Sequence, residues 1–600
     1  MQTMTVSALR QAYSEGSLSP DTLMAEIRQR AAEFSDRNIF IHLLSAEEQA
    51  PYLAALADKA IASHPLWGIP FVIKDNIDLA GITTTAACPE FAYTPGESAF
   101  VVQQLLDAGA IPVGKGNLDQ LATGLNGTRS PYGECHNSFD PDYISGGSSS
   151  GSAVSVALGL ASFSLGTDTA GSGRVPACFN NLVGVKPSRG LLSNRGMLPA
   201  CQTLDCISIF ALTLDDANQV LAVAEGFDSE DGYSRKNPFH NSARSFGMRS
   251  GPLKLGVIPA DQLKFFGSDS YAQAYQKSLD EIAQAGIELV ELDYAPFNEA
   301  ALLLYEGPWV SERYLAALPL VQEKPEALLP VIRTIIEPGG SKLATDLFSA
   351  QYRLQSLRQA CYAQLEQVDA LLTPTAGRHY TVAELLAEPI LYNSNLGYYT
   401  NYVNLLDMAG LAIPTQFTSE GMPFGLTLIG PAFSDRALMA IGNRIQQACP
   451  LDSVGKGMPA PAAATNPVAA PNTIDVAVCG AHLDGLPLNW QLKERGASLV
   501  AAVDSAPCYR FYALAGGPPY RPGMIRDEAN GRAIAMEVWR VPAAEFGSFV
   551  AGIPAPLGIG KVELADGRWV SGFICEPCGV DGAEEITQFG GWRTYLASKG

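Results

Sequence analysis

Apolar positions in the first three quarters of the chain alternate between the spacing of helices and that of strands. The segment LSPDTLMAEIRQRAAEF predicts a helix with Ser19 or Asp21 as its N-cap, because Leu23, Ile27 and Ala31 then fall on one face. Such a face has to be buried against another element. The pattern therefore predicts a packed domain from its first helix onward.

Further along the chain, helix-type and strand-type patterns follow one another. The apolar run Ile69–Ile73 is typical of a buried strand. Residues 98–117 and residues 150–168 each predict a helix followed by a strand. This alternation predicts an α/β domain over residues 1–454, with a mixed central β-sheet flanked by helices.

The pattern changes at residues 455–473, GKGMPAPAAATNPVAAPNT, which are rich in proline and alanine and show no apolar period. We interpret this stretch as a semi-stiff linker. Strand-type pieces at 474–480 and 533–541, with a turn signal at 565–567, predict a second, smaller domain over residues 474–600. Its fold is expected to be α+β or barrel-like.

Composition supports a multidomain globular protein and excludes some partners. The 600 residues exceed one core, since domains usually hold roughly 100–200 residues. A formal net charge of −21 repels nucleic acid and anionic membrane surfaces, and it disfavours small anions unless a local cation binds them.

Cysteine usage and hydropathy indicate a soluble, cytoplasmic protein. The 11 Cys are scattered without a disulfide framework, and no apolar run is long enough to span a membrane or to form a signal core. Cys575 and Cys578 form a CxxC with no second ligand pair, so we expect no metal site and no cofactor.

Two Gly/Ser-rich loops, residues 145–154 and 165–177, enclose one predicted helix. Residues 147–151 fit the G-x-S-x-G pattern of a hydrolase elbow, but the preceding stretch is polar and the chain holds only six His to serve as a base. Neither loop has the spacing of a phosphate-binding loop. Helix capping by Ser150 or Ser152 is compatible with a catalytic role of the same loop.

The loops resemble the amidase signature family. GGSSSGS (146–152) is similar to the family's GGSSGGS loop, and GTDTAGSGRVPA (166–177) is similar to its GTDxGGSxRxPA loop. The upstream GIPFVIKD (68–75) matches the lysine element G-x-P-x-x-x-K-D. The resemblance covers most of residues 20–445 and implies the amidase-signature fold.

The resemblance also implies a catalytic triad of an amidohydrolase. Ser172 is then the nucleophile, Ser148 the bridging serine on a cis peptide, and Lys74 the base. A lysine acts as a base only when uncharged, and burial at the end of Ile69–Ile73 would lower its pKa from about 10.4. On its position alone, Lys74 would be a strand-end lysine that reaches solvent.

Backbone N–H groups of the second loop are expected to form the oxyanion hole, namely those of Asp168, Thr169, Ala170 and Gly171. The side chains of Asp168 and Arg174 are expected to hold the loops together through charge-assisted hydrogen bonds.

Departures from the general family motif look like its allophanate hydrolase branch. Ser150 replaces a glycine, and YEGPWVSERY (305–314) resembles that branch's YxGPWxxER segment. The resemblance implies that Tyr305 and Arg313 bind the carboxylate of a small anionic amide, allophanate. Gly124 is expected to contact substrate through its backbone, although a turn glycine is the plainer interpretation.

Three segments after the linker, beginning with VAVCGAHLDGLPLNWQL (476–492), resemble the C-terminal domain of that branch. The resemblance implies decarboxylation of N-carboxycarbamate, the product of the first domain, with His482 as the matching residue. A lone histidine after a strand is otherwise more often structural.

Taken together, the resemblance implies an enzyme of urea degradation that depends on a separate urea carboxylase and forms a homodimer. The alternatives are an amidase for another small amide, a glutaminase-type amidotransferase subunit, and a non-catalytic scaffold. A second domain that only docks a partner is also open.

Overall fold

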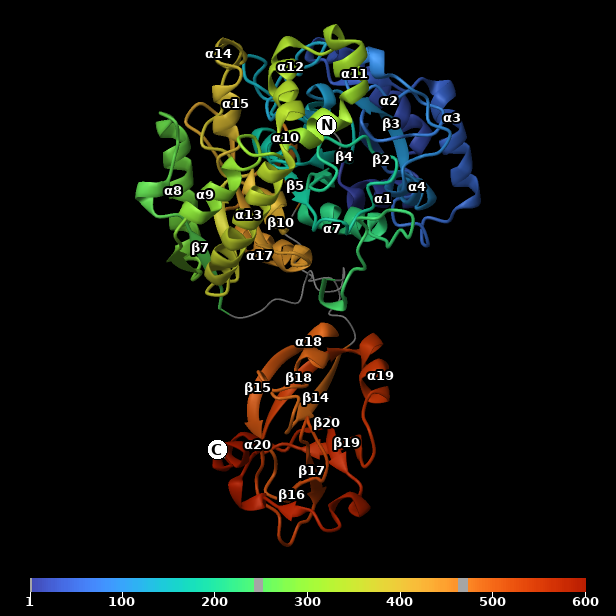
Figure 1. The fold of residues 1–600 in the computed structure, drawn as a ribbon. Coiled ribbons are helices and arrows are strands. Elements are labelled where there is room, and N and C mark those ends of the chain that lie inside the picture. Colours follow the sequence, from blue (N-terminus) through green and yellow to red (C-terminus); the bar gives the residue numbers. More distant parts are fainter. Residues whose placement is uncertain (1–2, 242–251, 462–472, 600) are drawn as a thin grey trace. The chain divides into compact units, whose positions relative to one another are not determined.

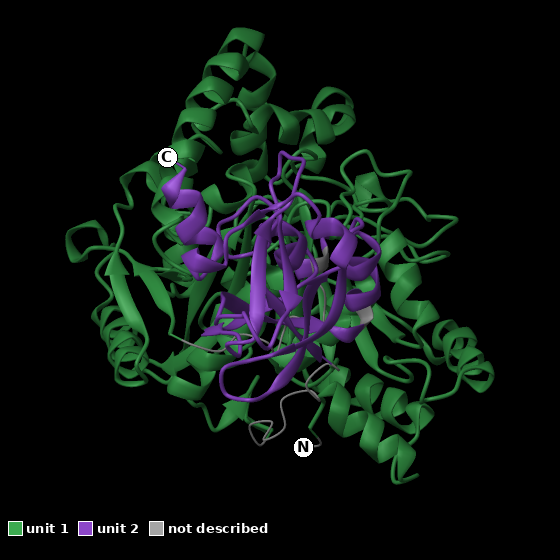
Figure 2. Ribbon diagram, turned by 90° about the horizontal axis from the view of Figure 1, so that it is seen from below, with its two compact units in different colours: residues 1–237, 249–463 green, residues 238–248, 464–600 purple. Residues whose placement is uncertain are grey.

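The computed structural model describes residues 3–241, 252–461 and 473–599 (Figure 1). The chain divides into two compact units, residues 1–237 with 249–463, and residues 238–248 with 464–600 (Figure 2). Each unit has its own sheets and its own buried apolar core, as expected for two domains.

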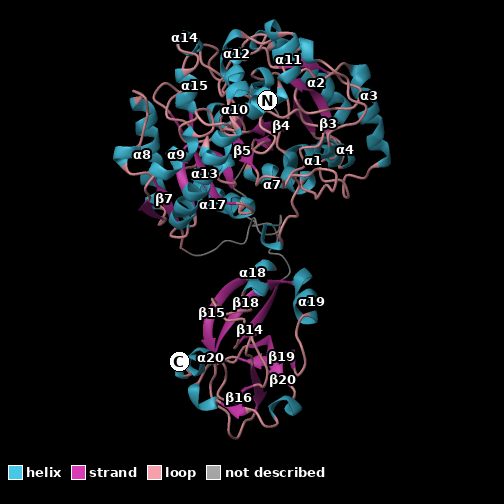
Figure 3. Ribbon diagram, viewed as in Figure 1, coloured by secondary structure: helices cyan, strands magenta, loops and turns pink. Residues whose placement is uncertain are grey.

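Unit 1 is built on an eleven-stranded mixed sheet flanked by helices (Figure 3). The strands follow the order β1-β3-β2-β4-β6-β5-β10-β11-β9-β7-β8. Their bounds are β1 Phe40–Leu43, β2 Pro70–Lys74, β3 Ile111–Gly116, β4 Phe163–Asp168, β5 Val183–Lys186, β6 Cys206–Ala211, β7 Lys254–Val257, β8 Glu288–Glu291, β9 Ala370–Pro374, β10 Met408–Phe417 and β11 Pro423–Pro431.

Helices cover the sheet and connect its strands. Their bounds are α1 Val6–Ser14, α2 Pro20–Glu33, α3 Ala46–Ala54, α4 Phe100–Asp107, α5 Ser150–Ala157, α6 Val175–Phe179, α7 Leu214–Ala224, α8 Asp269–Gln284, α9 Ala295–Leu302, α10 Val310–Ala316, α11 Leu318–Glu323, α12 Pro330–Ile336, α13 Ala344–Leu365, α14 Val382–Ala387, α15 Leu391–Leu396, α16 Tyr402–Leu405 and α17 Asp435–Ala448.

The sequence-based elements are confirmed where the apolar pattern is strongest. Helix α2 has Ser19 as its N-cap, whose hydroxyl accepts from the N–H of Thr22 at 3.2 Å, and it buries Leu23, Ile27 and Ala31. Strand β2 is buried at every position. Because β2 pairs in parallel with β3 and β4, Lys74 at its carboxyl end lies in the middle of the fold rather than at an edge.

The segment predicted to be a linker begins as ordered structure. Strands β12 Ser453–Val454 and β13 Met458–Pro459 form a hairpin on unit 1, where Met458 is buried and the N–H of Lys456 donates to Ala157 O at 2.8 Å. Residues 462–472 of the predicted linker lie outside the described residues.

Unit 2 is an α+β fold, and its observed sheets are open rather than barrel-like. A five-stranded sheet in the order β15-β18-β14-β20-β19 accompanies a three-stranded sheet β17-β16-β21. The bounds are β14 Thr473–Val478, β15 Ser498–Asp504, β16 Tyr509–Ala513, β17 Pro522–Arg526, β18 Ala535–Pro542, β19 Leu557–Glu563, β20 Trp569–Cys575, β21 Glu584–Glu585, α18 Trp490–Glu494, α19 Ala543–Ala551 and α20 Trp592–Ser598.

Candidate active site

Lys74 is a fully buried cation of the candidate site. Its side chain is fully inaccessible, and its Nζ donates to Ser148 Oγ at 2.8 Å and to Thr167 Oγ1 at 2.7 Å. Burial lowers the pKa of Lys74 to about 7, although the carboxylates of Asp119, Asp205 and Asp168 oppose this by raising it. With a pKa near neutrality, a sizeable share of this amine is uncharged at neutral pH and can act as a base.

Ser148 links the lysine to the first Gly/Ser loop. The Gly147–Ser148 peptide bond is cis, as the family resemblance implied, and α5 begins two residues later. The carbonyl of Ser148 accepts from the N–H of Asp119 at 3.1 Å, which ties the loop to the segment that follows β3. Ser148 is completely buried, so its hydroxyl is shielded from bulk water.

Ser172 lies in the second loop, between β4 and α6, and is 3% exposed. Its hydroxyl donates to Gly124 O at 3.3 Å. Within the described part of the chain no hydrogen bond joins Ser172 to Ser148. The structure therefore contains the Lys74–Ser148 link of the predicted relay, and the Ser148–Ser172 link requires the Ser172 hydroxyl to turn away from Gly124.

The second loop is held in shape by one carboxylate. Asp168 accepts from Arg174 Nε at 2.9 Å and Nη2 at 3.0 Å, and from the N–H groups of Gly171 and Gly173 at 3.0 Å each. The expected structural role of the Asp168–Arg174 pair is thus visible as a bidentate, fully buried ion pair.

The same contacts distinguish three of the four expected oxyanion donors, Thr169, Ala170 and Gly171. The N–H of Gly171 already donates to Asp168, whereas those of Thr169 and Ala170 donate to no acceptor in the described ranges. Gly171 is needed for another reason, since its φ is +133° and a Cβ there would lie 2.4 Å from Thr400 Oγ1. Thr169 and Ala170 are therefore the donors best placed for a developing negative charge.

Asp205 belongs to the site, although no sequence motif singled it out. Its carboxylate accepts from Thr169 Oγ1 at 2.5 Å and from the N–H groups of Ala200 and Cys201 at 2.7 and 3.1 Å. Burial raises the pKa of Asp205 to about 6. An acidic residue directly before the apolar strand Cys206–Ala211 was the available signal, since a carboxylate there is expected at a sheet end.

Gly124 lies on a loop organised by Asp119. That carboxylate accepts from the N–H groups of Asn126, Gly127 and Arg129 at 3.0 to 3.2 Å. A Cβ on Gly124 would lie 2.5 Å from Asp119 Oδ2, so only glycine fits. In this structure the carbonyl of Gly124 accepts the Ser172 hydroxyl, and its expected contact with substrate stays a prediction.

Arg313, on α10, is a buried cation near the loop that carries Gly124. It is 3% exposed, and its guanidinium donates to Thr123 Oγ1 at 3.0 Å, Ala122 O at 3.3 Å and Tyr305 Oη at 3.2 Å. The Tyr305 ring lies 5.3 Å from the guanidinium carbon. Among the described residues no carboxylate forms an ion pair with it, and a buried charge in that condition favours binding of an anion.

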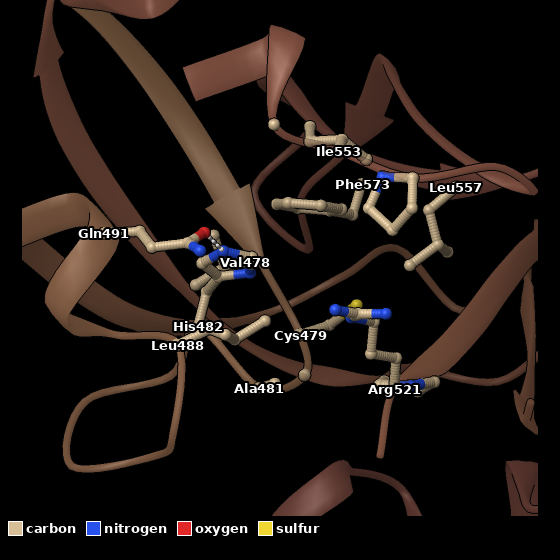
Figure 4. Close-up of a pocket in the computed structure, with 14 residues that line it drawn as sticks. Val478, Cys479, Ala481, His482, Leu488, Gln491, Arg521, Ile553, Leu557 and Phe573 are labelled. Carbon is tan, nitrogen blue, oxygen red and sulfur yellow. Dashed lines mark hydrogen bonds between the residues drawn. The ribbon is translucent and has the colours of Figure 1, made fainter. Parts of the chain in front are cut away.

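His482 lies in unit 2, in the loop after β14, and lines a cavity of about 40 Å³ (Figure 4). Its Nε2 is 2.9 Å from Gln491 Oε1, and its ring stacks on Phe573 with centroids 5.0 Å apart. Burial lowers the pKa of His482, and the nearby Arg521 and Arg495 lower it further, against a hydrogen bond with Gln491 that raises it.

The described residues contain no group of three His, Cys, Asp or Glu side chains placed to hold a metal ion. Likewise, no helix in these ranges combines the length and apolar character needed to cross a membrane.

Each of the two units matches a known protein family. The amidase family model matches residues 24–439, and the model for the allophanate hydrolase C-terminal domain matches residues 474–597. The solved structure of Kluyveromyces lactis allophanate hydrolase is similar, with 38% identity, 99% of each chain covered and a TM-score of 0.76.

Similar curated proteins include two longer ones. Urea amidolyase of Saccharomyces cerevisiae is 42% identical over 93% of this chain, and that of Lachancea kluyveri is 40% identical over 96%. The chain spans about a third of their length, 31% and 32%.

A third relative aligns over almost its whole length. This relative, one of the subunits of the Prochlorococcus marinus glutamyl-tRNA(Gln) amidotransferase, is 31% identical, over 74% of this chain and 97% of the relative. Since the amidase model also matches residues 24–439 of the 600, this chain belongs to the amidase family.

Proposed function

We propose that unit 1 hydrolyses the terminal amide of allophanate to ammonia and N-carboxycarbamate, and that unit 2 decarboxylates this product, in urea degradation. The observation that carries the proposal is the buried Arg313, which has no carboxylate partner in the described chain and contacts the loop that carries Gly124. A protein of net charge −21 binds a small anion only with such a local cation.

The proposed reaction uses the observed Lys74–Ser148 contact and a Ser148–Ser172 contact that forms when the Ser172 hydroxyl turns away from Gly124. Neutral Lys74 accepts the Ser148 proton while Ser148 accepts that of Ser172, and Ser172 Oγ attacks the amide carbonyl. The N–H groups of Thr169 and Ala170 stabilise the oxyanion. The relay in reverse protonates the departing ammonia, and water then releases the acyl group from Ser172 as the second carboxylate.

Substrate choice is tested with a panel of allophanate, malonamate, biuret and glutamine, each assayed for ammonia release. We expect allophanate to be preferred and Arg313→Lys to raise KM for it sharply, because lysine lacks the two-pronged guanidinium. A preference for glutamine would instead favour an amidotransferase subunit, and an unchanged KM would remove Arg313 from the site.

The proposed decarboxylation in unit 2 is tested by substitution of His482. We expect His482→Ala to leave release of the first ammonia unchanged and to slow formation of bicarbonate, since a nitrogen must be protonated as the C–N bond breaks. If total ammonia and bicarbonate form as in the unsubstituted protein, His482 has no catalytic role and unit 2 is a docking module.

We also propose a cytoplasmic homodimer of chains, each divided as residues 1–454, 455–473 and 474–600. Exposed apolar side chains in unit 1 support self-association: Phe348 and Tyr352, four residues apart on α13, are 53% and 72% exposed. Sedimentation of the full chain, with Phe348→Glu as the disrupting variant, measures this state. A urea carboxylase must supply the substrate, because allophanate is carboxylated urea.

A further inference from the structure

The cavity of unit 2 has mostly apolar walls and three polar side chains. Val478, Cys479, Leu488, Ile553, Leu557 and Phe573 contribute apolar walls. Among the described residues that line it, only His482, Gln491 and Arg521 bring polar side-chain heads to the cavity (Figure 4). Small-molecule sites commonly have this character, in which a few polar groups fix orientation inside an apolar pocket.

Arg521 occupies a fixed place at the edge of this cavity. It immediately precedes β17, and its carbonyl accepts from the N–H of Leu514 at 3.1 Å, which closes the loop between β16 and β17. The backbone is therefore anchored, and the side chain extends into the cavity (Figure 4).

The guanidinium of Arg521 forms no hydrogen bond or ion pair with any residue in the described ranges. Other arginines of the unit behave differently: Arg510, Arg526 and Arg540 pair with Glu585, Glu563 and Asp475. An unpaired guanidinium that faces an apolar cavity is well suited to bind a carboxylate through two parallel hydrogen bonds.

We propose that Arg521 is the carboxylate-binding residue of a small-dicarboxylate site in this cavity, with His482 facing the central nitrogen of the bound dianion. The inference rests on the proposed function, because that function supplies the dianion, N-carboxycarbamate, from the first reaction. Beyond the proposed function, the inference assigns Arg521 as a binding residue and gives the orientation of the bound dianion.

The bound orientation accounts for the chemistry of the second step. One carboxylate pairs with Arg521, and the other lies among the apolar walls, where release as neutral CO2 removes a poorly solvated charge. The C–N bond to that carboxylate breaks, its electron pair stays on nitrogen, and His482 gives nitrogen one proton. Burial and Arg521 lower the pKa of His482, so the imidazole carries this proton only while the dianion is bound beside it. The dianion and one proton become carbamate and CO2, so atoms and charge balance.

Malonate is the probe for binding, since it carries two carboxylates on one central atom and cannot react by this route. The chain has six His, so titration of the full chain with malonate can be followed in ring resonances, with His482→Ala to assign the signal of His482. We expect Arg521→Ala to weaken malonate binding at this resonance on the order of 10–100-fold, and Arg521→Lys to recover only part of it.

Turnover is measured separately with ¹³C-labelled allophanate. Arg521→Ala should leave the rate of first ammonia release unchanged while N-carboxycarbamate accumulates. The matched control is Arg568→Ala, whose arginine pairs with Asp566 in the exposed turn between β19 and β20 and should change neither readout.

The two proposals fail differently. If the unsubstituted chain releases no ammonia from allophanate, the proposed function is wrong, and malonate still tests the site. If ammonia is released but Arg521→Ala changes neither the malonate titration nor the lifetime of N-carboxycarbamate, Arg521 is not the binding residue.

Discussion

In the proposed relay a single amine, Lys74, decides whether the site can hydrolyse amides at neutral pH. Its burial follows from its position at the end of an interior strand, where both neighbouring strands run parallel to it. The lowered pKa is the direct consequence of that desolvation, and the three nearby carboxylates keep the value near 7 rather than far below it.

For this lysine we expect kcat/KM to rise with pH through about 7, because the active form is the neutral amine. Lys74→Ala should lower kcat by roughly 10²–10⁴-fold, the usual contribution of a positioned base. Lys254→Ala, an exposed lysine paired with Glu288, is the control and should be silent. A variant at position 74 with near-normal turnover, or a pH profile that is flat through neutrality, contradicts the relay.

Asp205 is predicted to position the oxyanion loop through Thr169. Asp205→Asn should lower kcat about 10- to 100-fold, since a hydrogen bond to a charged group contributes about 1.5–3 kcal/mol. The carboxylate also raises the pKa of Lys74, so its removal should move the acid limb of kcat/KM to lower pH. A purely structural role would lower activity at every pH without moving that limb.

At the scale of elements, the periodicity of apolar residues predicted helices and strands of the sheet. It could not predict contacts between segments that are far apart in the sequence. Helix α2 and strand β2 were evident from apolar spacing. The approach of Asp205 to Thr169 and of Thr400 to Gly171 depends on how β6 and the segment before α16 pack, which no local pattern encodes. The motif loops were recognisable because their glycines and serines are clustered in sequence.

The loop between β4 and α6 provides a test of backbone shape. Gly171→Ala would place a Cβ 2.4 Å from Thr400 Oγ1 at a φ of +133°. The loop must then shift, and the displaced Thr169 and Ala170 donors should cost about 2.7–4 kcal/mol in activation free energy. Thermal unfolding and kcat are measured together.

The control for this loop is Gly421→Ala, in the turn between β10 and β11. Gly421 also has a positive φ, +76°, but open space around its Cβ position. It should lose about 1 kcal/mol of stability with kcat unchanged. Equal effects of the two substitutions on kcat would show that backbone strain, and not displacement of the donors, explains the loss.

At the scale of the whole molecule, the division into two units was predictable from composition, whereas its details were not. The proline- and alanine-rich stretch indicated where one core ends. The hairpin β12–β13 could not be predicted from the sequence, because its few residues are held by contacts to Ala157 and Asn181, which are far away in sequence. Short ordered segments of this kind depend on the surface beneath them more than on their own pattern.

The net charge of −21 makes a prediction that belongs to the entire molecule. An anionic substrate is repelled over a Debye length of about 30 Å at 0.01 M salt, but only about 8 Å at 0.15 M. Arg313 is buried, so salt screens its attraction for a bound carboxylate much less than it screens the surface field. We therefore expect kcat/KM for allophanate to rise a few-fold over this range, while that for biuret, a neutral amide, stays constant. A fall for allophanate would mean that the cationic pocket, and not the acidic surface, governs capture.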